Sequence, residues 1–235
     1  MKKNNRQKIY ILHGWAYSIQ SWEPVVTLFK KNGFDPVLLK IPGLTAPLDR
    51  VWNLNNYVNW LKTKLDQEKE PVILLGHSNG GRISLAYSYK YPDKIQKLIL
   101  IDSAGIYHNE LPVRIKRIVF ITLAKTGKMF GKISILRKQL YKLAREHDYE
   151  KASPVMQKTM RNLIKVDLVH TFEHIVVPTI IIWGENDVIT SVKDGKLMHR
   201  NLRNSTLHII KHARHSPQFT NTEEVVKIIV KELRK

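Results

Sequence analysis

The chain has 235 residues, of which 43% are hydrophobic and 25% charged, the composition of an ordinary globular protein. This length predicts one sizeable domain, or one domain with an insertion, able to bury an ample core. The absence of cysteine excludes disulfides, thiolate nucleophiles and cysteine-ligated metal sites. A formal net charge of +19 is compatible with nucleic acid, anionic membrane or acidic partners. No nucleic-acid module is visible, so we do not expect specific nucleic-acid binding.

The apolar segments are too short for membrane insertion or export. After a basic and polar start, the apolar stretch 9–12 ends at His13-Gly14 and is far shorter than a signal-peptide core. No segment reaches the roughly 18 apolar residues that a membrane span requires. We therefore predict a cytoplasmic protein.

Strands and helices are expected to alternate from the first residues onward. Residues 8–12 form a short buried strand, and Ser18 or Ser21 caps the helix that follows. Residues 34–41 form the next strand, and apolar residues recur at helical spacing over 54–65. This alternation predicts a parallel sheet covered by helices on both faces, with active groups at the carboxyl ends of the strands.

The motif around which the chain is organised follows. Residues 72–82 read Val-Ile-Leu-Leu-Gly-His-Ser-Asn-Gly-Gly-Arg, an apolar strand ending in Gly-x-Ser-x-Gly and then a helix. This setting is typical of a nucleophile elbow, in which Ser78 sits at a sharp, strained turn. Gly76 and Gly80 would remove side chains that collide at the turn, and Gly81 would let the helix pack close to the sheet.

The alternation stops after a strand at 97–101 and resumes about seventy residues later. Between them lie mainly helical segments, one at 113–147 and another at 155–169. We predict a sheet-containing core formed by residues 1–104 and 176–235, with a helical cap inserted at 105–175. The other expected elements are a helix at 82–89, a strand at 178–183, a helix at 193–202, a strand at 206–210 and a helix at 223–233.

Two later loops supply partners for the serine. A serine hydroxyl needs a general base, and that base needs an acid that fixes its tautomer. Asp187 follows the strand at 178–183, and His215 follows the last strand. Ser78, Asp187 and His215 are therefore the predicted catalytic residues.

Other residues compete for these roles. His212 lies three positions before His215, and His208 lies within the last strand. Asp194 is expected within a helix, while Asp102 ends an earlier strand and stays open as an alternative acid. His215 is favoured because Pro217 fixes its loop.

Acyl transfer also requires donors for the developing oxyanion. The backbone amide of Asn79, directly after the nucleophile, is one predicted donor, and the amide of Trp15, after the first strand, is the other. The Trp15 indole is expected to line the acyl pocket. His13, Ile106 and Phe130 are further candidates for substrate contact, although hydrogen bonding within loops is the simpler role for His13 and for His77.

These motifs, in this order, resemble the α/β-hydrolase superfamily across nearly the whole chain. They are His13-Gly14-Trp15, the elbow at 76–81, Asp102-Ser103-Ala104-Gly105, Gly184-Glu185-Asn186-Asp187 and His215-Ser216-Pro217. The resemblance implies an α/β-hydrolase fold with a mainly parallel sheet of about six strands, a Ser78–Asp187–His215 triad and a helical cap. It extends to small carboxylesterases, including the pimeloyl-acyl-carrier-protein methyl esterases, and to carbon–carbon bond hydrolases of aromatic degradation.

Two features depart from the superfamily pattern. The antiparallel strands that usually open the fold are missing from the predicted elements, because the first expected strand leads directly to His13-Gly14. Arg214 stands where a glycine usually precedes the catalytic histidine, and this cation could alter the loop or touch the substrate.

The predicted cap is strongly basic. From Leu111 to Arg145 there are ten Lys or Arg residues and no Asp or Glu, interleaved with apolar residues. An apolar face could cover an acyl pocket beneath a basic outer face. The basic face has three interpretations: a solvated surface, a docking site for an acidic carrier protein or anionic substrate, or contact with an anionic membrane.

The sequence thus predicts a serine hydrolase that cleaves a small-molecule ester or acyl thioester with a hydrophobic acyl group through an acyl-enzyme. It requires no metal and no organic cofactor. Carbon–carbon hydrolysis or acyl transfer by the same triad is the alternative, and a non-catalytic ligand-binding or membrane-associated protein of this fold is a further one.

Overall fold

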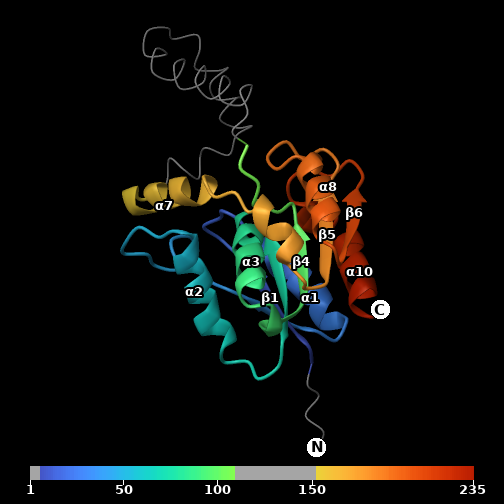
Figure 1. Cartoon of the computed structure of the whole chain (residues 1–235). Helices are drawn as coiled ribbons and strands as arrows, with labels where there is room; N and C mark the ends of the chain where they lie inside the picture. The colour runs from blue at the N-terminus through green and yellow to red at the C-terminus, as the bar shows by residue number, and fades with distance from the viewer. Residues whose placement is uncertain (1–5, 109–151) are drawn as a thin grey trace, which may run out of the picture.

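The computed structural model describes residues 6–108 and 152–235, which are drawn in colour in Figure 1. In this part of the chain six parallel strands form one sheet, in the order β2-β1-β3-β4-β5-β6. The predicted parallel sheet of about six strands is therefore confirmed. The strands are β1 (Lys8–Leu12), β2 (Asp35–Leu38), β3 (Val72–His77), β4 (Ile95–Ile101), β5 (Thr179–Gly184) and β6 (Ser205–Ile210).

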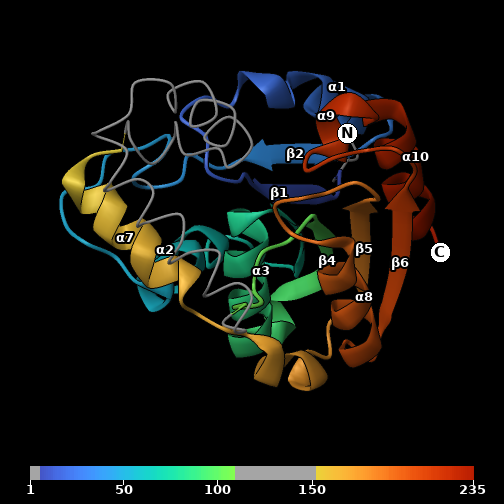
Figure 2. The same ribbon diagram turned by 90° about the horizontal axis from the view of Figure 1, so that it is seen from above.

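Helices cover both faces of this sheet (Figure 2). On β1, Ile9 and Ile11 face a core shared with α1 (Glu23–Lys31) and α10 (Thr222–Leu233). Tyr10 and Leu12 face a core shared with α2 (Leu54–Leu65), α3 (Asn79–Lys90) and α8 (Val192–Asn201). This alternation follows from the two-residue period of a strand. The other α-helices of the described residues are α7 (Pro154–Ile164) and α9 (Pro217–Thr220).

The strand order places the site. β1 and β3 are neighbours although β2 separates them along the chain, so the winding direction of the sheet reverses between them. In open α/β sheets, ligands bind in the crevice at the carboxyl ends of the strands at such a reversal. The loop after β1 and the turn after β3 meet there, and they carry Trp15 and Ser78.

Three expected elements differ by several residues at one end. The strand expected at 34–41 ends at Leu38, because the chain turns away and Ile41 N donates to the Thr45 hydroxyl at 2.9 Å. The helix expected from Arg82 begins directly after Ser78. The helix expected to reach Val169 ends at Ile164, and the Asp167 carboxylate then accepts from Val169 N at 3.3 Å, a local bond that competes with helix.

The predicted serine cap of α1 is wrong. The N-cap residue is Trp22, without a side-chain cap, because a short 3-10 turn, η1 (Gln20–Trp22), leads into the helix. Ser18 instead accepts a hydrogen bond from Gln20 N at 3.3 Å. Glu23 in the first turn supplies the negative charge that a helix N-terminus favours.

The predicted boundaries of the cap stay a prediction. Residues 109–151, and with them the basic stretch and Phe130, lie outside the described residues. Of the predicted insertion, α7 buries Met156, Met160 and Leu163 in the core that α2 also shares. Among the described helices, none combines the length and hydrophobicity of a membrane span.

Candidate active site

Ser78 occupies a sharp turn between β3 and α3. Its backbone has φ 54° and ψ −118°, a conformation that costs an ordinary residue free energy and that persists where the surroundings enforce it. Two hydrogen bonds tie the turn to β4 and the segment after it: Ser78 N donates to Ile101 O at 3.1 Å, and Ala104 N donates to Ser78 O at 2.9 Å. The ends of β3 and β4 thus fix the serine at the carboxyl edge of the sheet.

Close backbone approach explains the glycines after the serine. A Cβ on Gly80 would lie 2.1 Å from the Leu12 carbonyl oxygen, and one on Gly81 would lie 2.2 Å from Ser103 Oγ. The start of α3 therefore packs directly on β1 at Gly80 and on the segment after β4 at Gly81. A side chain at either position would force the elbow away from the sheet.

The structure brings Ser78, His215 and Asp187 into one hydrogen-bonded chain. His215 Nε2 lies 3.0 Å from Ser78 Oγ, and His215 Nδ1 lies 2.7 Å from Asp187 Oδ2. The histidine and the aspartate are both buried, 5% and 7% exposed. A carboxylate can only accept, so Nδ1 carries the hydrogen and Nε2 is left to accept from the serine hydroxyl. This is the arrangement that lets a histidine remove a serine proton.

The Asp187 carboxylate is held by its own loop. Its Oδ1 accepts from Ile189 N at 2.8 Å and from Thr190 N at 3.2 Å. The Thr190 hydroxyl lies 2.8 Å from Asp187 Oδ2, 3.1 Å from Asp102 O and 3.2 Å from His215 Nδ1. Sequence reasoning missed Thr190. A hydroxyl residue three positions after an aspartate is a turn signal that could have found it.

The rival histidines lie elsewhere. The side chain of His212 is 90% exposed and faces Glu185 at 3.8 Å. His208 Nε2 lies 3.4 Å from the carboxylate of Glu232, a residue of α10. Neither is hydrogen bonded to Ser78 in the described structure.

The rival acids are engaged in other contacts. Asp194 lies on α8 and accepts from His108 Nε2 at 3.0 Å. Asp102 is fully buried, and its Oδ1 accepts from Gly184 N at 2.8 Å, which ties the end of β4 to the end of β5. His77, Asp102 and His215 lie close enough to share a metal ion. Both His215 nitrogens are already engaged, so a metal there would have to displace the bond to Ser78 or to Asp187.

One cavity of about 490 Å³ opens over Ser78. Its size suits a small-molecule substrate. Trp15 and Asn79, whose backbone amides are the predicted oxyanion donors, line it with Ser78, and Ile106 lines it too. Gly14 also touches the nucleophile, because a Cβ there would lie 3.0 Å from Ser78 Cβ. The amide roles and the substrate contacts stay predictions.

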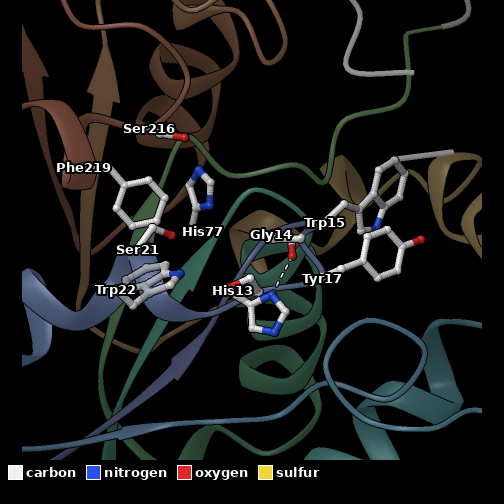
Figure 3. A pocket seen from close by; sticks show the side chains of 11 residues that line it. His13, Gly14, Trp15, Tyr17, Ser21, Trp22, His77, Ser216 and Phe219 are labelled. Carbon is white, nitrogen blue, oxygen red and sulfur yellow. Dashed lines mark hydrogen bonds between the residues drawn. The ribbon is translucent and has the colours of Figure 1, made fainter. Parts of the chain in front are cut away.

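His13 faces a second cavity, of about 580 Å³ (Figure 3). Its Nδ1 donates to Gly14 O at 2.7 Å, and its Nε2 lies 2.9 Å from the Thr45 hydroxyl. Burial lowers the pKa of His13 below its ordinary value. The ring is therefore neutral at pH 7 and ties the loop after β1 to the turn after β2, while Trp15 borders both cavities.

The ring of His215 packs against His77, which belongs to a cluster with Trp22 and Phe219. The His77 ring centroid lies 5.1 Å from that of His215 and 6.2 Å from those of Trp22 and Phe219. Trp22 and Phe219 meet edge to face at 5.2 Å. Figure 3 shows His77, Trp22 and Phe219 together at one end of the second cavity.

Arg214 does not disturb the histidine loop. Its side chain is exposed, and its carbonyl accepts from Ser216 N at 2.8 Å. The glycine that the chain does need here is Gly184, where a Cβ would lie 2.3 Å from Arg214 O.

A serine in a strained strand-to-helix turn, with an acid and a histidine delivered by later loops of a parallel sheet, defines an α/β-hydrolase. The comparisons with known proteins agree. The chain belongs to the Hydrolase_4 family, described as serine aminopeptidase, S33, whose model matches residues 3–221.

Esterases and lipases are among the relatives and structural neighbours. The chain is 25% identical over 237 residues to a pimeloyl-[acyl-carrier protein] methyl ester esterase of Legionella pneumophila (strain Paris), covering 94% of this chain and 93% of the relative. It is 22% identical to monoacylglycerol lipase ABHD6 of Mus musculus, over 97% of this chain and 76% of the relative. A crystal structure of a putative lipase from Acinetobacter baumannii AYE superposes with a TM-score of 0.76 at 23% identity, covering 97% and 83%. The chain is a serine hydrolase of the carboxylesterase type.

Proposed function

We propose that this chain hydrolyses carboxylic esters through an acyl-enzyme formed on Ser78. The observation that carries the proposal is the hydrogen-bonded chain from Ser78 Oγ through His215 to the buried Asp187, with distances of 3.0 and 2.7 Å. The family and the esterase and lipase relatives support the same reaction class.

In acylation, His215 Nε2 takes the Ser78 proton as Oγ attacks the ester carbonyl carbon. The amides of Trp15 and Asn79 donate to the oxyanion, and the N-terminus of α3 adds a favourable field. His215 then passes the proton to the leaving oxygen as the carbon–oxygen bond breaks. Asp187 orients the imidazole and stabilises its charged form.

In deacylation, His215 removes a proton from water as that water attacks the acyl-enzyme. The proton returns to Ser78 Oγ when the acid product leaves, so the serine is regenerated. Every step uses side chains and amides of this chain.

The proposed acyl group is hydrophobic. On the Ser78 cavity, Ile106, Ile164, Val188 and Ile189 provide apolar walls. An oxygen ester is the primary proposed substrate. A thioester is the alternative substrate for the same mechanism, because the acyl-enzyme is identical and only the leaving group differs.

The relatives named for a pimeloyl-[acyl-carrier protein] ester suggest an acyl chain presented by an acidic carrier protein. We include such a carrier, and a cytoplasmic location, in the proposal. Turnover of a methyl ester attached to carrier protein should exceed turnover of the free methyl ester. Equal turnover would remove the carrier from the proposal.

The reaction is tested by a substrate screen. Nitrophenyl esters and N-acetylcysteamine thioesters of increasing acyl length should be hydrolysed by the wild-type chain and not by Ser78→Ala. Circular dichroism of Ser78→Ala verifies that it folds. Turnover that survives in Ser78→Ala would overturn the proposal, as would a wild-type chain inert toward every ester and thioester.

A further inference from the structure

Arg82 lies one helical turn after the nucleophile and on the same cavity. Its backbone N donates to Ser78 O at 3.3 Å, and its side chain lines the wall that Ser78 also lines. Residues four apart on a helix are about 6 Å apart along its axis. A group held by Arg82 would therefore lie within a few bonds of the reacting carbonyl.

Burial of Arg82 is unusual for an arginine. The residue is 5% exposed, and burial lowers the pKa of its guanidinium to about 10. The sign follows from desolvation, which penalises the charged form. With a pKa about three units above neutral pH, the guanidinium still carries its charge at pH 7. Buried charges are normally paired.

No carboxylate pairs with this charge in the described structure. The ion pairs among residues 6–108 and 152–235 do not include Arg82. Its Nη1 donates to Asn79 Oδ1 at 3.0 Å, a neutral acceptor, and its Nε is buried without a hydrogen-bond partner. The guanidinium thus holds an unused Nε donor and has no ion-pair partner in the described residues.

The neighbours of Arg82 add further donors. Asn79 Nδ2 and Trp15 Nε1 are also buried without an acceptor, and both residues line the same cavity. The carboxylate on this cavity, that of Asp194, is held by His108 Nε2 at 3.0 Å. The lining of the cavity therefore combines apolar side chains with buried, unpaired donors and the positive charge of Arg82.

We propose that Arg82 binds a carboxylate of the substrate, so that the preferred substrates are monoesters of dicarboxylic acids. A guanidinium and a carboxylate carry opposite charges, and both are planar groups that can form two parallel hydrogen bonds with each other. An apolar chain between the ester and the carboxylate fits the isoleucine and valine walls. This proposal rests on the proposed ester hydrolysis at Ser78. In that reaction the ester carbon–oxygen bond is cleaved, and the carboxylate held by Arg82 stays unchanged.

The test compares esters that differ only in the far end of the acyl chain. Monomethyl esters of the dicarboxylic acids from succinate to pimelate are paired with the methyl esters of monocarboxylic acids of the same carbon number. Acid release is followed in a pH-stat. For at least one chain length, the wild-type chain should show a kcat/KM about tenfold or more higher for the anionic ester, because a hydrogen bond to a charged group typically carries this much discrimination.

Variants of Arg82 test whether this residue causes the preference for anionic esters. Arg82→Gln should lower the ratio of anionic to neutral kcat/KM by about 30-fold. Arg82→Lys should lower it by less, since a lysine keeps the positive charge but loses the bidentate geometry of the guanidinium. Arg203→Gln, an exposed arginine between α8 and β6, is the matched control and should keep the wild-type ratio.

The outcomes separate the two proposals. A wild-type chain that cleaves neutral esters at least as fast as anionic ones at every chain length would overturn the Arg82 proposal and leave ester hydrolysis standing. Equal losses for both esters in Arg82→Gln would also overturn it. If that variant does not fold, the wild-type ratio decides alone. A wild-type chain inert toward all esters would overturn both proposals.

Discussion

The Thr190 hydroxyl lies 2.8 Å from Oδ2 of Asp187, the oxygen that also accepts from His215 Nδ1. Thr190 thus fixes the carboxylate that fixes the imidazole. Thr190→Val should lower kcat for nitrophenyl butyrate about tenfold, the effect of a hydrogen bond contributing roughly 1.4 kcal/mol. Thr190→Ser keeps the hydroxyl and should recover most of the rate. Equal activity of the valine and serine variants would show that the hydroxyl has no positioning role.

The acid of the triad can be separated from its rival. Asp187→Asn removes the only carboxylate hydrogen bonded to His215 in the described structure, and should lower kcat by about 10⁴-fold, as loss of the tautomer-fixing acid does in serine proteases. Asp102→Asn keeps an oxygen that can accept from Gly184 N, and should cost less than about tenfold. Steady-state kinetics on both variants decide. The reverse order of losses would make Asp102 the acid.

Replacement of Gly80 by alanine should destabilise the protein, which is the opposite of its usual effect in a helix. In an unobstructed helix, glycine to alanine stabilises by about 1 kcal/mol. Here the new Cβ would lie 2.1 Å from the Leu12 carbonyl oxygen, so Gly80→Ala should destabilise by about 2 kcal/mol or more. Urea unfolding measures the difference. A variant as stable as the wild type would mean that α3 does not pack on β1 as closely as described.

His13 predicts a pH dependence of stability. Burial lowers its folded-state pKa below the unfolded value of about 6.5. Between these two values the unfolded chain binds more protons, so stability falls as pH drops below about 6.5. His13→Gln should reduce that slope by at most about 1.4 kcal/mol per pH unit, the limit for one proton.

The matched control is His212→Gln, because His212 is an exposed histidine and its replacement should leave the slope as in the wild type. Urea midpoints measured from pH 7 down to pH 5 provide the comparison. The same slope in the wild type and in His13→Gln would contradict the burial argument.

The sequence was most informative where chain order and local pattern determine the geometry. The apolar run before Gly76 and the glycines after Ser78 predicted the elbow, because a strand leading into a helix leaves few ways to present a serine. The loops that carry Asp187 and His215 were predicted from the order of strands, since parallel strands end at one edge of the sheet. The structure brings these three side chains together.

Other features depend on contacts that no local pattern records. His13 adjoins the motif after β1, yet its ring turns to Thr45 and the second cavity, because the side-chain direction is set by the turn after β2. Arg82 was expected only as the start of a helix, and its burial depends on the walls contributed by distant segments. The strand at β2 is shorter than its apolar run because a side-chain bond to Thr45 redirects the backbone.

The measurement closest to the central claim is covalent labelling of the nucleophile. A fluorophosphonate should add to the wild-type chain with a stoichiometry of about one, and peptide mass spectrometry should place the adduct on Ser78. Labelling should be lost in Ser78→Ala and strongly slowed in His215→Ala, because the histidine activates the serine. An adduct on another residue, or equal labelling of the Ser78→Ala variant, would contradict the assignment of Ser78 as the nucleophile.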